Sequence, residues 1–269
     1  MIGRFGGIPL VVKNLLIINI LMLFIGFVMR STFGVEINRV FGLYFFRSEY
    51  FQPYQFVTHM FMHGGLAHLF FNMFALWMFG RVLEGVWGSK RFLIYYFVTG
   101  VGAAVLHTFV NWIEISSMVS SANAFINTPS PELFAAFIED HISRPRREVY
   151  DFITNWQNNP ESAAYINQAI TMVENSVRQQ MNIPTVGASG AVFGVLLAFG
   201  MLFPNTQLLL LFPPIPIKAK YFVIAYGVIE LYLGLTRPGS NIAHFAHLGG
   251  MLFGFILIKY WSRNRRSFF

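Results

Sequence analysis

Cysteine is absent from the 269-residue sequence, which excludes a disulfide framework and a metal site built on thiolates. Charged residues are also scarce: Asp, Glu, Lys and Arg make up 12% of the chain, about half of the roughly 25% found in soluble domains. Hydrophobic residues make up 55%, and 31 residues are Phe. This composition favours a protein embedded in lipid. The net charge of +7 would suit either a nucleic-acid binder or a membrane protein with basic cytoplasmic loops, so its distribution along the chain must decide.

Six segments approach the roughly 20 apolar residues that a membrane-spanning helix needs. The sequence therefore predicts an all-α membrane protein, a bundle of six transmembrane helices. The first segment is too long for the apolar part of a signal peptide and is followed by no small-residue cleavage site, so we expect a retained first span. The six segments are approximately Val12–Met29, Leu66–Met78, Phe92–Trp112, Gly187–Phe203, Ala219–Leu235 and Ala243–Trp261.

Lys and Arg are divided unevenly between the two sides of this predicted bundle. One side receives both termini and the loops after the second and fourth spans, and Glu84 is its only acid. Because Lys and Arg accumulate in cytoplasmic loops, we expect both termini to be cytoplasmic. The expected location is the plasma membrane of a bacterium, although the sequence does not separate it from an organelle membrane. The basic residues of this side are Arg4, Lys13, Arg81, Lys90, Arg91, Lys218, Lys220, Lys259, Arg263, Arg265 and Arg266.

A polar stretch interrupts the hydrophobic pattern between the third and fourth spans, and on this topology it is extracytoplasmic. Two helix starts are readable in it, Ser130-Pro131-Glu132 and Asn159-Pro160-Glu161, each with an N-cap residue, a Pro and an acid. We interpret the stretch as a helical insert, either an amphipathic cap packed on the membrane domain or a lid that gates substrate. After the second start, one helical face carries Ile166, Ile170, Val173 and Val177. The predicted division is 1–113 for spans one to three, 114–184 for the insert, and 185–269 for spans four to six with a short basic tail.

A serine motif, Gly187-Ala188-Ser189-Gly190, stands where the insert enters the fourth span. A serine at a helix N-terminus lies near unpaired backbone N–H groups and the positive end of the helix dipole, which are the donors that an oxyanion needs. Taken alone the motif is weak, because Ser beside Gly is common where membrane helices pack.

Two histidine motifs open the sixth and second spans. The first, His244-Phe245-Ala246-His247, is notable because histidine is rare in apolar spans and is well suited to exchange protons near neutral pH. In the other motif, His68 and Asn72 are four residues apart, so they share a helical face and can both donate hydrogen bonds to a developing negative charge. Since the other histidines of this region have no matching carboxylate cluster, no metal site is predicted.

The three motifs should meet, because spans two, four and six run in the same direction in a six-span bundle. They are then at the same membrane face and at similar depth. No Asp or Glu lies near Ser189 or His247 in sequence, so the predicted machinery is a dyad whose imidazole is oriented by packing or by another group. Phe193, one turn after Ser189, is a candidate ring for His247 to pack against.

Small residues let helix backbones approach closely, and the fourth and sixth spans both contain them. Gly190 and Gly194 form a pair on the fourth span, and Gly250 and Gly254 form another on the sixth. We expect these pairs to bring the two spans into contact.

In combination, G-x-S-G at Gly187–Gly190, H-x-x-G-x-x-x-G at His247–Gly254 and H-x-x-x-N at His68–Asn72 resemble the rhomboid family of intramembrane serine proteases. The resemblance covers roughly Tyr54–Phe109 and Gly187–Trp261. It implies a rhomboid-like six-helix bundle that cleaves single-pass membrane proteins near the outer membrane face, without metal or cofactor.

The same resemblance assigns roles to individual residues. Ser189 is the expected nucleophile and His247 the general base. The expected oxyanion hole consists of His68, Asn72 and the backbone N–H of Ser189. His63 resembles an additional upstream histidine of the family, and Glu84 a structural acid. The remaining supporting residues are Gly187, Gly190, Phe193, Gly250 and Gly254, of which Phe193 stands where some members have Tyr.

The expected partners are transmembrane protein substrates and the lipid bilayer, with no nucleic acid, and the sequence leaves the oligomeric state open. Two other interpretations were weighed. A non-catalytic binder of transmembrane segments is less favoured, because inactive relatives lack the Ser or the His. A transporter or channel would need polar residues along a whole path, whereas here they cluster at one end, with Glu230 the main acid within a late span.

Overall fold

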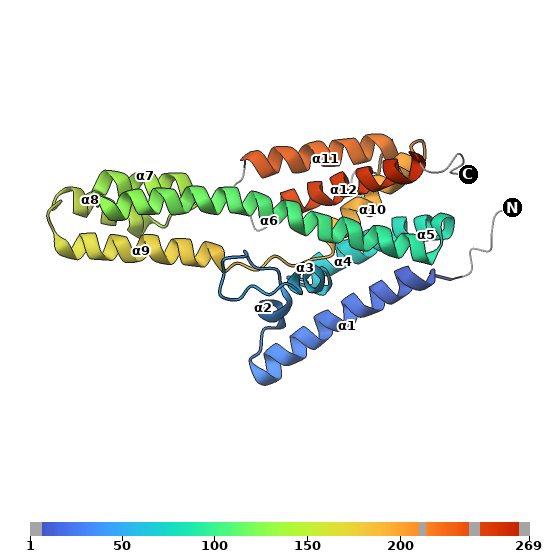
Figure 1. Cartoon of the computed structure of the whole chain (residues 1–269), viewed down its shortest axis with the longest axis horizontal. Helices are drawn as coiled ribbons and strands as arrows, with labels where there is room; N and C mark the ends of the chain where they lie inside the picture. The colour runs from blue at the N-terminus through green and yellow to red at the C-terminus, as the bar shows by residue number, and fades with distance from the viewer. Residues whose placement is uncertain (1–6, 210–213, 237–242, 264–269) are drawn as a thin grey trace.

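The computed structural model describes residues 7–209, 214–236 and 243–263, and within these ranges the regular secondary structure is helical apart from one two-stranded antiparallel sheet (Figure 1). The basic residues Arg4, Arg265 and Arg266 lie outside the described residues. The elements are α1 (Leu10–Phe33), α2 (Ile37–Phe41), α3 (Gln55–Thr58), the 3-10 helix η1 (His59–Phe61), α4 (Leu66–Ala75), the π-helical turn η2 (Leu76–Gly80), α5 (Arg81–Trp87), α6 (Ser89–Asn127), α7 (Pro131–His141), α8 (Arg147–Gln157), α9 (Ala163–Met181), α10 (Ser189–Leu202), β1 (Gln207–Leu209), β2 (Pro216–Lys218), α11 (Ala219–Thr236) and α12 (His244–Arg263).

Each of the six predicted apolar segments falls on a helix: α1, the continuous run from α4 to α5, α6, α10, α11 and α12. Four of these runs are long and apolar enough to cross a membrane, namely Leu10–Phe33, Leu66–Trp87, Ser89–Asn127 and Ala219–Thr236, while Ser189–Leu202 is a shorter apolar helix. The chain is therefore an integral membrane protein with several spans. The start of α1 and the end of α12 lie at one end of the molecule, and α7–α9 lie at the other (Figure 1).

Helices α6, α10 and α12 pack closely at glycines. A Cβ on Gly250 would overlap the backbone of Gly190, so α10 and α12 touch backbone to backbone, as predicted. The prediction was incomplete for the other two glycines, because a Cβ on Gly194 or Gly254 would overlap side chains of α6. The small residues therefore serve two interfaces, and α6 fixes both α10 and α12.

The segment between the third and fourth spans forms a helical bundle with its own apolar core. Contrary to the predicted end near Trp112, α6 continues to Asn127. The reason is that its second half carries a further apolar face. Met118, Ala122 and Phe125 of this face are buried in one core with residues of α7, α8 and α9.

The helix starts within this bundle were predicted in part. Ser130 caps α7 as expected, since its hydroxyl accepts the N–H of Leu133 at 3.2 Å. Helix α8 was not predicted. The second predicted start, Asn159-Pro160-Glu161, was wrong: these residues form a turn, in which the indole N–H of Trp156 donates to the carbonyl of Pro160 at 3.3 Å, and α9 begins at Ala163. The predicted apolar face of α9 packs into the bundle core, with Val173 fully buried.

Glu84 connects the start of α1 to α5. Its carboxylate oxygens accept the backbone N–H groups of Val11 and Val12 at 2.9 and 2.8 Å, and the hydroxyl of Ser89 at 2.6 Å. The first N–H groups of a helix have no partner within the helix, and negative charge is favourable there. These contacts fit the structural role that the family resemblance implied for this acid.

Replacing Glu84 by Gln should destabilise the protein, because an amide nitrogen cannot accept the hydrogen bonds that a carboxylate oxygen accepts. We expect the free energy of unfolding to fall by about 1.5–3 kcal/mol, measured as a lower Tm of the detergent-solubilised protein. Glu174→Gln, which changes an exposed acid on α9, is the control and should alter stability by less than about 0.5 kcal/mol. Equal Tm values for both variants would contradict the capping role.

Candidate active site

Ser189 is the first residue of α10, and the segment that precedes it is tightly fixed. Thr185 forms a β-bridge with the loop after α2, and the N–H of Gly187 donates to the carbonyl of His59 at 2.9 Å. Gly187 has a φ of 132°, and a Cβ there would lie 2.8 Å from the His68 ring and 3.6 Å from the Ser189 hydroxyl. Glycine is needed at this position both for its backbone conformation and for space.

His247 contacts Ser189 directly. Its Nε2 lies 2.9 Å from the Ser189 Oγ. The ring of Phe193 stacks on the imidazole with centroids 4.0 Å apart and planes at 5°. Both contacts agree with the sequence predictions, and together they fix the imidazole in position and in plane.

A carboxylate that was not predicted from the sequence contacts the other side of the His247 ring. Glu230 Oε2 lies 2.9 Å from His247 Nδ1 and 2.7 Å from His244 Nδ1, and all three side chains are buried. The sequence left open whether packing or another group orients the imidazole, and in the structure both Phe193 and Glu230 contact it. Glu230 lies on α11, and α11 packs against the start of α12, where a Cβ on Gly234 would already lie 3.2 Å from Phe245. A lone acid in an otherwise apolar span was the signal that could have found it.

The carboxylate determines the tautomer of His247. A carboxylate only accepts hydrogen bonds, so the Nδ1 atoms of His244 and His247 must both donate to Glu230. The Nε2 of a neutral His247 then carries a lone pair, and the Ser189 hydroxyl donates to it. The serine proton therefore faces a base that can accept it.

The cluster of Glu230, His244 and His247 has three groups that also serve as metal ligands in proteins. Its nitrogen–oxygen separations of 2.7 and 2.9 Å are hydrogen-bond lengths. Two ligands of a tetrahedral zinc ion, each about 2.0–2.1 Å from the metal, lie roughly 3.3 Å apart. The geometry therefore fits a hydrogen-bonded relay better than a metal site.

The residues predicted for an oxyanion hole lie at the start of α4. The His68 ring stands beside Gly187, next to the Ser189 hydroxyl. Asn72 is buried, and its amide donates to the carbonyl of His68 at 3.1 Å, which occupies one of its two N–H groups. His63 packs edge-on against His68, and burial lowers the pKa of His63 to about 4, which keeps its ring neutral.

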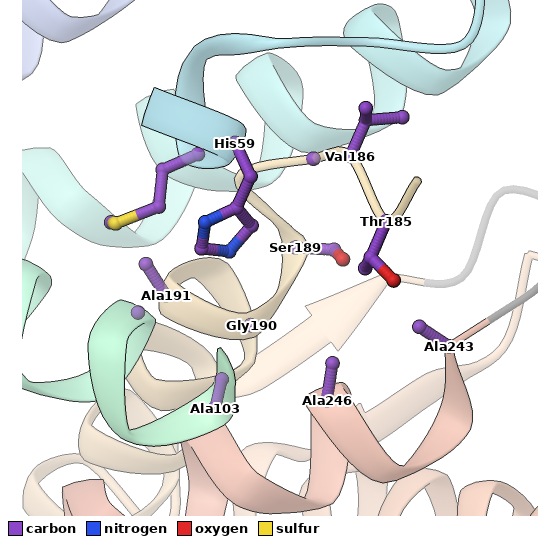
Figure 2. A pocket seen from close by; sticks show the side chains of 12 residues that line it. His59, Ala103, Thr185, Val186, Ser189, Gly190, Ala191, Ala243 and Ala246 are labelled. Carbon is purple, nitrogen blue, oxygen red and sulfur yellow. The ribbon is translucent and has the colours of Figure 1, made fainter. Parts of the chain in front are cut away.

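A small cavity of about 20 Å³ borders Ser189, enough for about one water molecule. Figure 2 shows Ser189, His59 and Thr185 around it, with Ala246 of α12 and Ala243, the residue before that helix, on one side. Sequence analysis had assigned no role to His59 or Thr185. A third residue it missed is His107 of α6, whose Nε2 lies 2.9 Å from the Thr185 hydroxyl. A lone histidine in a span was the available signal.

A sequence model of the rhomboid domain matches residues 50–116 and 162–264, more than half of the chain. The chain belongs to the rhomboid family. The matched residues include Ser189, His247, Glu230 and the start of α4. Residues 117–161, which lie between the two matched ranges, fall within the helical bundle of α6–α9.

Relatives of this rhomboid chain come from several sources. An uncharacterized mitochondrial rhomboid protein of Schizosaccharomyces pombe is 29% identical over 221 residues, which are 77% of this chain and 51% of that protein. The rhomboid protease GluP of Bacillus subtilis is 41% identical over 49 residues, 18% of this chain and 10% of GluP. The mitochondrial rhomboid protein 1 of Saccharomyces cerevisiae is 38% identical over 80 residues, 30% of this chain and 23% of that protein. The chain thus spans about half the length of the first relative and less of the others.

Gly250→Ala should separate α12 from α10, because the new methyl group would overlap the Gly190 backbone. We expect a destabilisation of about 1–3 kcal/mol and a reactivity of Ser189 towards a fluorophosphonate at least tenfold lower, since the Ser189–His247 contact lengthens. Gly85→Ala is the matched control, as this exposed helical glycine has nothing within 4 Å of a Cβ. Unchanged reactivity in Gly250→Ala would show that the serine does not depend on this packing.

Proposed function

We propose that this rhomboid protein is an intramembrane serine endopeptidase that hydrolyses peptide bonds in or near transmembrane segments of single-pass membrane proteins. The observation that carries the proposal is the 2.9 Å separation of Ser189 Oγ and His247 Nε2 at the start of two close-packed helices. The relative GluP, which is named a rhomboid protease, supports it. No cofactor is required for this chemistry.

The proposed reaction proceeds through an acyl-enzyme. His247 accepts the Ser189 proton while Oγ attacks the scissile carbonyl, and the imidazolium then gives this proton to the leaving amine. The oxyanion is stabilised by the backbone N–H of Ser189, which begins α10, and by His68 and Asn72. Water, activated by the same histidine, then hydrolyses the ester.

We further propose that Ser189 lies below the membrane surface. Helix α10 has 14 residues, which is about 21 Å at 1.5 Å per residue. The hydrocarbon core is roughly 30 Å thick. Helix α10 therefore does not cover the whole core by itself, and we propose that the chain leading into Ser189 enters the membrane and completes this crossing. Ser189 is then submerged and needs a water-filled access path.

For topology, we propose that α1, α4–α5, α6, α10, α11 and α12 all span the membrane. The termini then lie on the side rich in Lys and Arg. The start of α1 and the end of α12 lie at one end of the molecule, opposite α7–α9, which supports an even number of spans (Figure 1). On this topology residues 114–184 form an extracytoplasmic insert between membrane segments 1–113 and 185–269.

The relatives do not favour the bacterial plasma membrane that the sequence analysis expected. Their names place them in mitochondria or chloroplasts as well as in a bacterium. The proposal is therefore an integral membrane of either kind, with Ser189 near the face opposite the termini.

Ser189→Ala should abolish cleavage of a reporter with a single transmembrane segment, because the nucleophile is lost. We expect the variant to keep the wild-type Tm and to lose labelling by a fluorophosphonate. Ser262→Ala, a serine exposed on α12, is the control and should cleave and label normally. Cleavage by Ser189→Ala at the wild-type rate would refute the assignment. A wild-type protein that neither cleaves nor labels would favour a non-catalytic binder of membrane segments.

Removing a proposed oxyanion donor should slow the chemical step. For His68→Ala and for Asn72→Ala we expect kcat to fall by about 10²–10³, with little change in KM. Phe71→Ala, on the exposed face of α4, should leave kcat within about twofold of the wild type. If only KM rises in the two variants, these residues bind substrate instead of stabilising the oxyanion.

A further inference from the structure

We propose that Glu230 is a positioning residue of this protease site, the third member of a Ser189–His247–Glu230 relay, and that His244 holds Glu230 in place. The proposal rests on the proposed proteolytic function. It goes beyond the Ser–His dyad by assigning the orientation of the base to a carboxylate on α11.

Glu230 is a buried acid on a helix whose neighbouring residues are exposed. The flanking residues Ile229, Leu231 and Tyr232 are exposed on the surface of α11, whereas Glu230 is only 5% exposed and faces α12. An acid buried in an apolar span is costly unless it is paired, and such residues usually serve function. The hydrogen bonds found for Glu230 both go to histidine Nδ1 atoms.

The carboxylate of Glu230 also selects the tautomer of His247. By accepting the Nδ1 hydrogen at 2.9 Å, Glu230 selects the tautomer whose Nε2 can accept the serine proton. When that proton moves from Ser189 Oγ to Nε2, the resulting imidazolium lies against the carboxylate and is stabilised. The proton on Nδ1 stays on the ring, so Glu230 is not protonated in the reaction. The interaction is therefore stronger in the transition state than in the resting state, which raises kcat.

His244 is buried at the first position of α12. Its Nδ1 donates to the same oxygen of Glu230 as His247 does, at 2.7 Å. The two donors lie on one helix, three residues apart, and hold Oε2 between them. His244 thereby prevents the carboxylate from turning away from His247 during turnover.

A structural alternative is that Glu230 merely fastens α11 to the start of α12. The two roles differ in what they require of the side chain. A purely structural contact depends on the length and the hydrogen bonds of the Glu230 side chain, and Gln preserves these better than Asp does. Stabilising the imidazolium of His247 needs a negative charge, which Asp keeps and Gln lacks.

The test compares Glu230→Gln and Glu230→Asp with the wild type and with Glu174→Gln, in full-length protein reconstituted into liposomes with a transmembrane reporter. We expect Glu230→Gln to lower kcat by about 10²–10⁴ and to change KM by less than about threefold. Glu230→Asp should keep more activity than Glu230→Gln, and Glu174→Gln should match the wild type. Glu230→Gln cleaving within threefold of the wild type, or exceeding Glu230→Asp, would overturn the proposal.

A second measurement does not depend on the folding of any variant at Glu230. In wild-type protein labelled with ¹⁵N-histidine, the ring nitrogens of His247, assigned with His247→Gln, should show a protonated Nδ1 and an unprotonated Nε2. A proton on Nε2 of the neutral ring would overturn the proposal.

The proposed function can be judged separately. If the wild type labels with a fluorophosphonate, Ser189→Ala does not, and Glu230→Gln is fully active, then the protease assignment stands and only the role of Glu230 falls. If the wild type neither labels nor cleaves, both fall together.

Discussion

The backbone contact of α10 and α12 at Gly190 and Gly250 is the constraint on which the site depends. Lipid offers helices no hydrophobic reason to associate, so close packing at small residues supplies the attraction. This contact leaves no room even for a methyl group, and it therefore sets the register of the two helices. Ser189 is adjacent to one glycine and His247 is one turn before the other, so the same contact places the hydroxyl and the imidazole across a gap of 2.9 Å.

Around this contact, the buried acids follow a common rule. Glu84 and Glu230 are buried among apolar helices, and each meets backbone or side-chain hydrogen-bond donors at the end of another helix. Helix starts are the places where backbone N–H groups lack partners, which makes them favourable for negative charge and for water. Glu84 accepts such backbone N–H groups at the start of α1, whereas Glu230 accepts the side-chain Nδ1–H groups of His244 and His247 near the start of α12. The acids thus fix the ends of helices whose middles are held by apolar packing.

The sequence was sufficient to predict the positions of the apolar helices, because the membrane environment constrains them strongly. A spanning helix must satisfy its own backbone hydrogen bonds, so apolar length alone located the six helices, and small residues indicated where two of them touch. Glu230 was missed because its relation to His247 depends on how α11 packs against α12, and separation along the chain does not report this. The extension of α6 was missed for another reason. The second half of α6 is polar on average, and this concealed a regular apolar face that begins at Ile115 and ends at Phe125.

The continuity of α6 bears on the two interpretations of the helical insert. This helix has 39 residues, about 58 Å at 1.5 Å per residue, and its first half packs on α10 and α12 while its second half carries the bundle of α7–α9. A gating lid would need a hinge between these halves, and helices bend sharply at Pro, at Gly or at irregular turns. From Ala103 to Asn127 the helix contains neither Pro nor Gly. On the return path, Ser48 and Asn182 are joined by a hydrogen bond of 2.6 Å. Both connections between the bundle and the rest of the chain are thus continuous helix or anchored by a hydrogen bond, and α7–α9 pack on the second half of α6 and on one another.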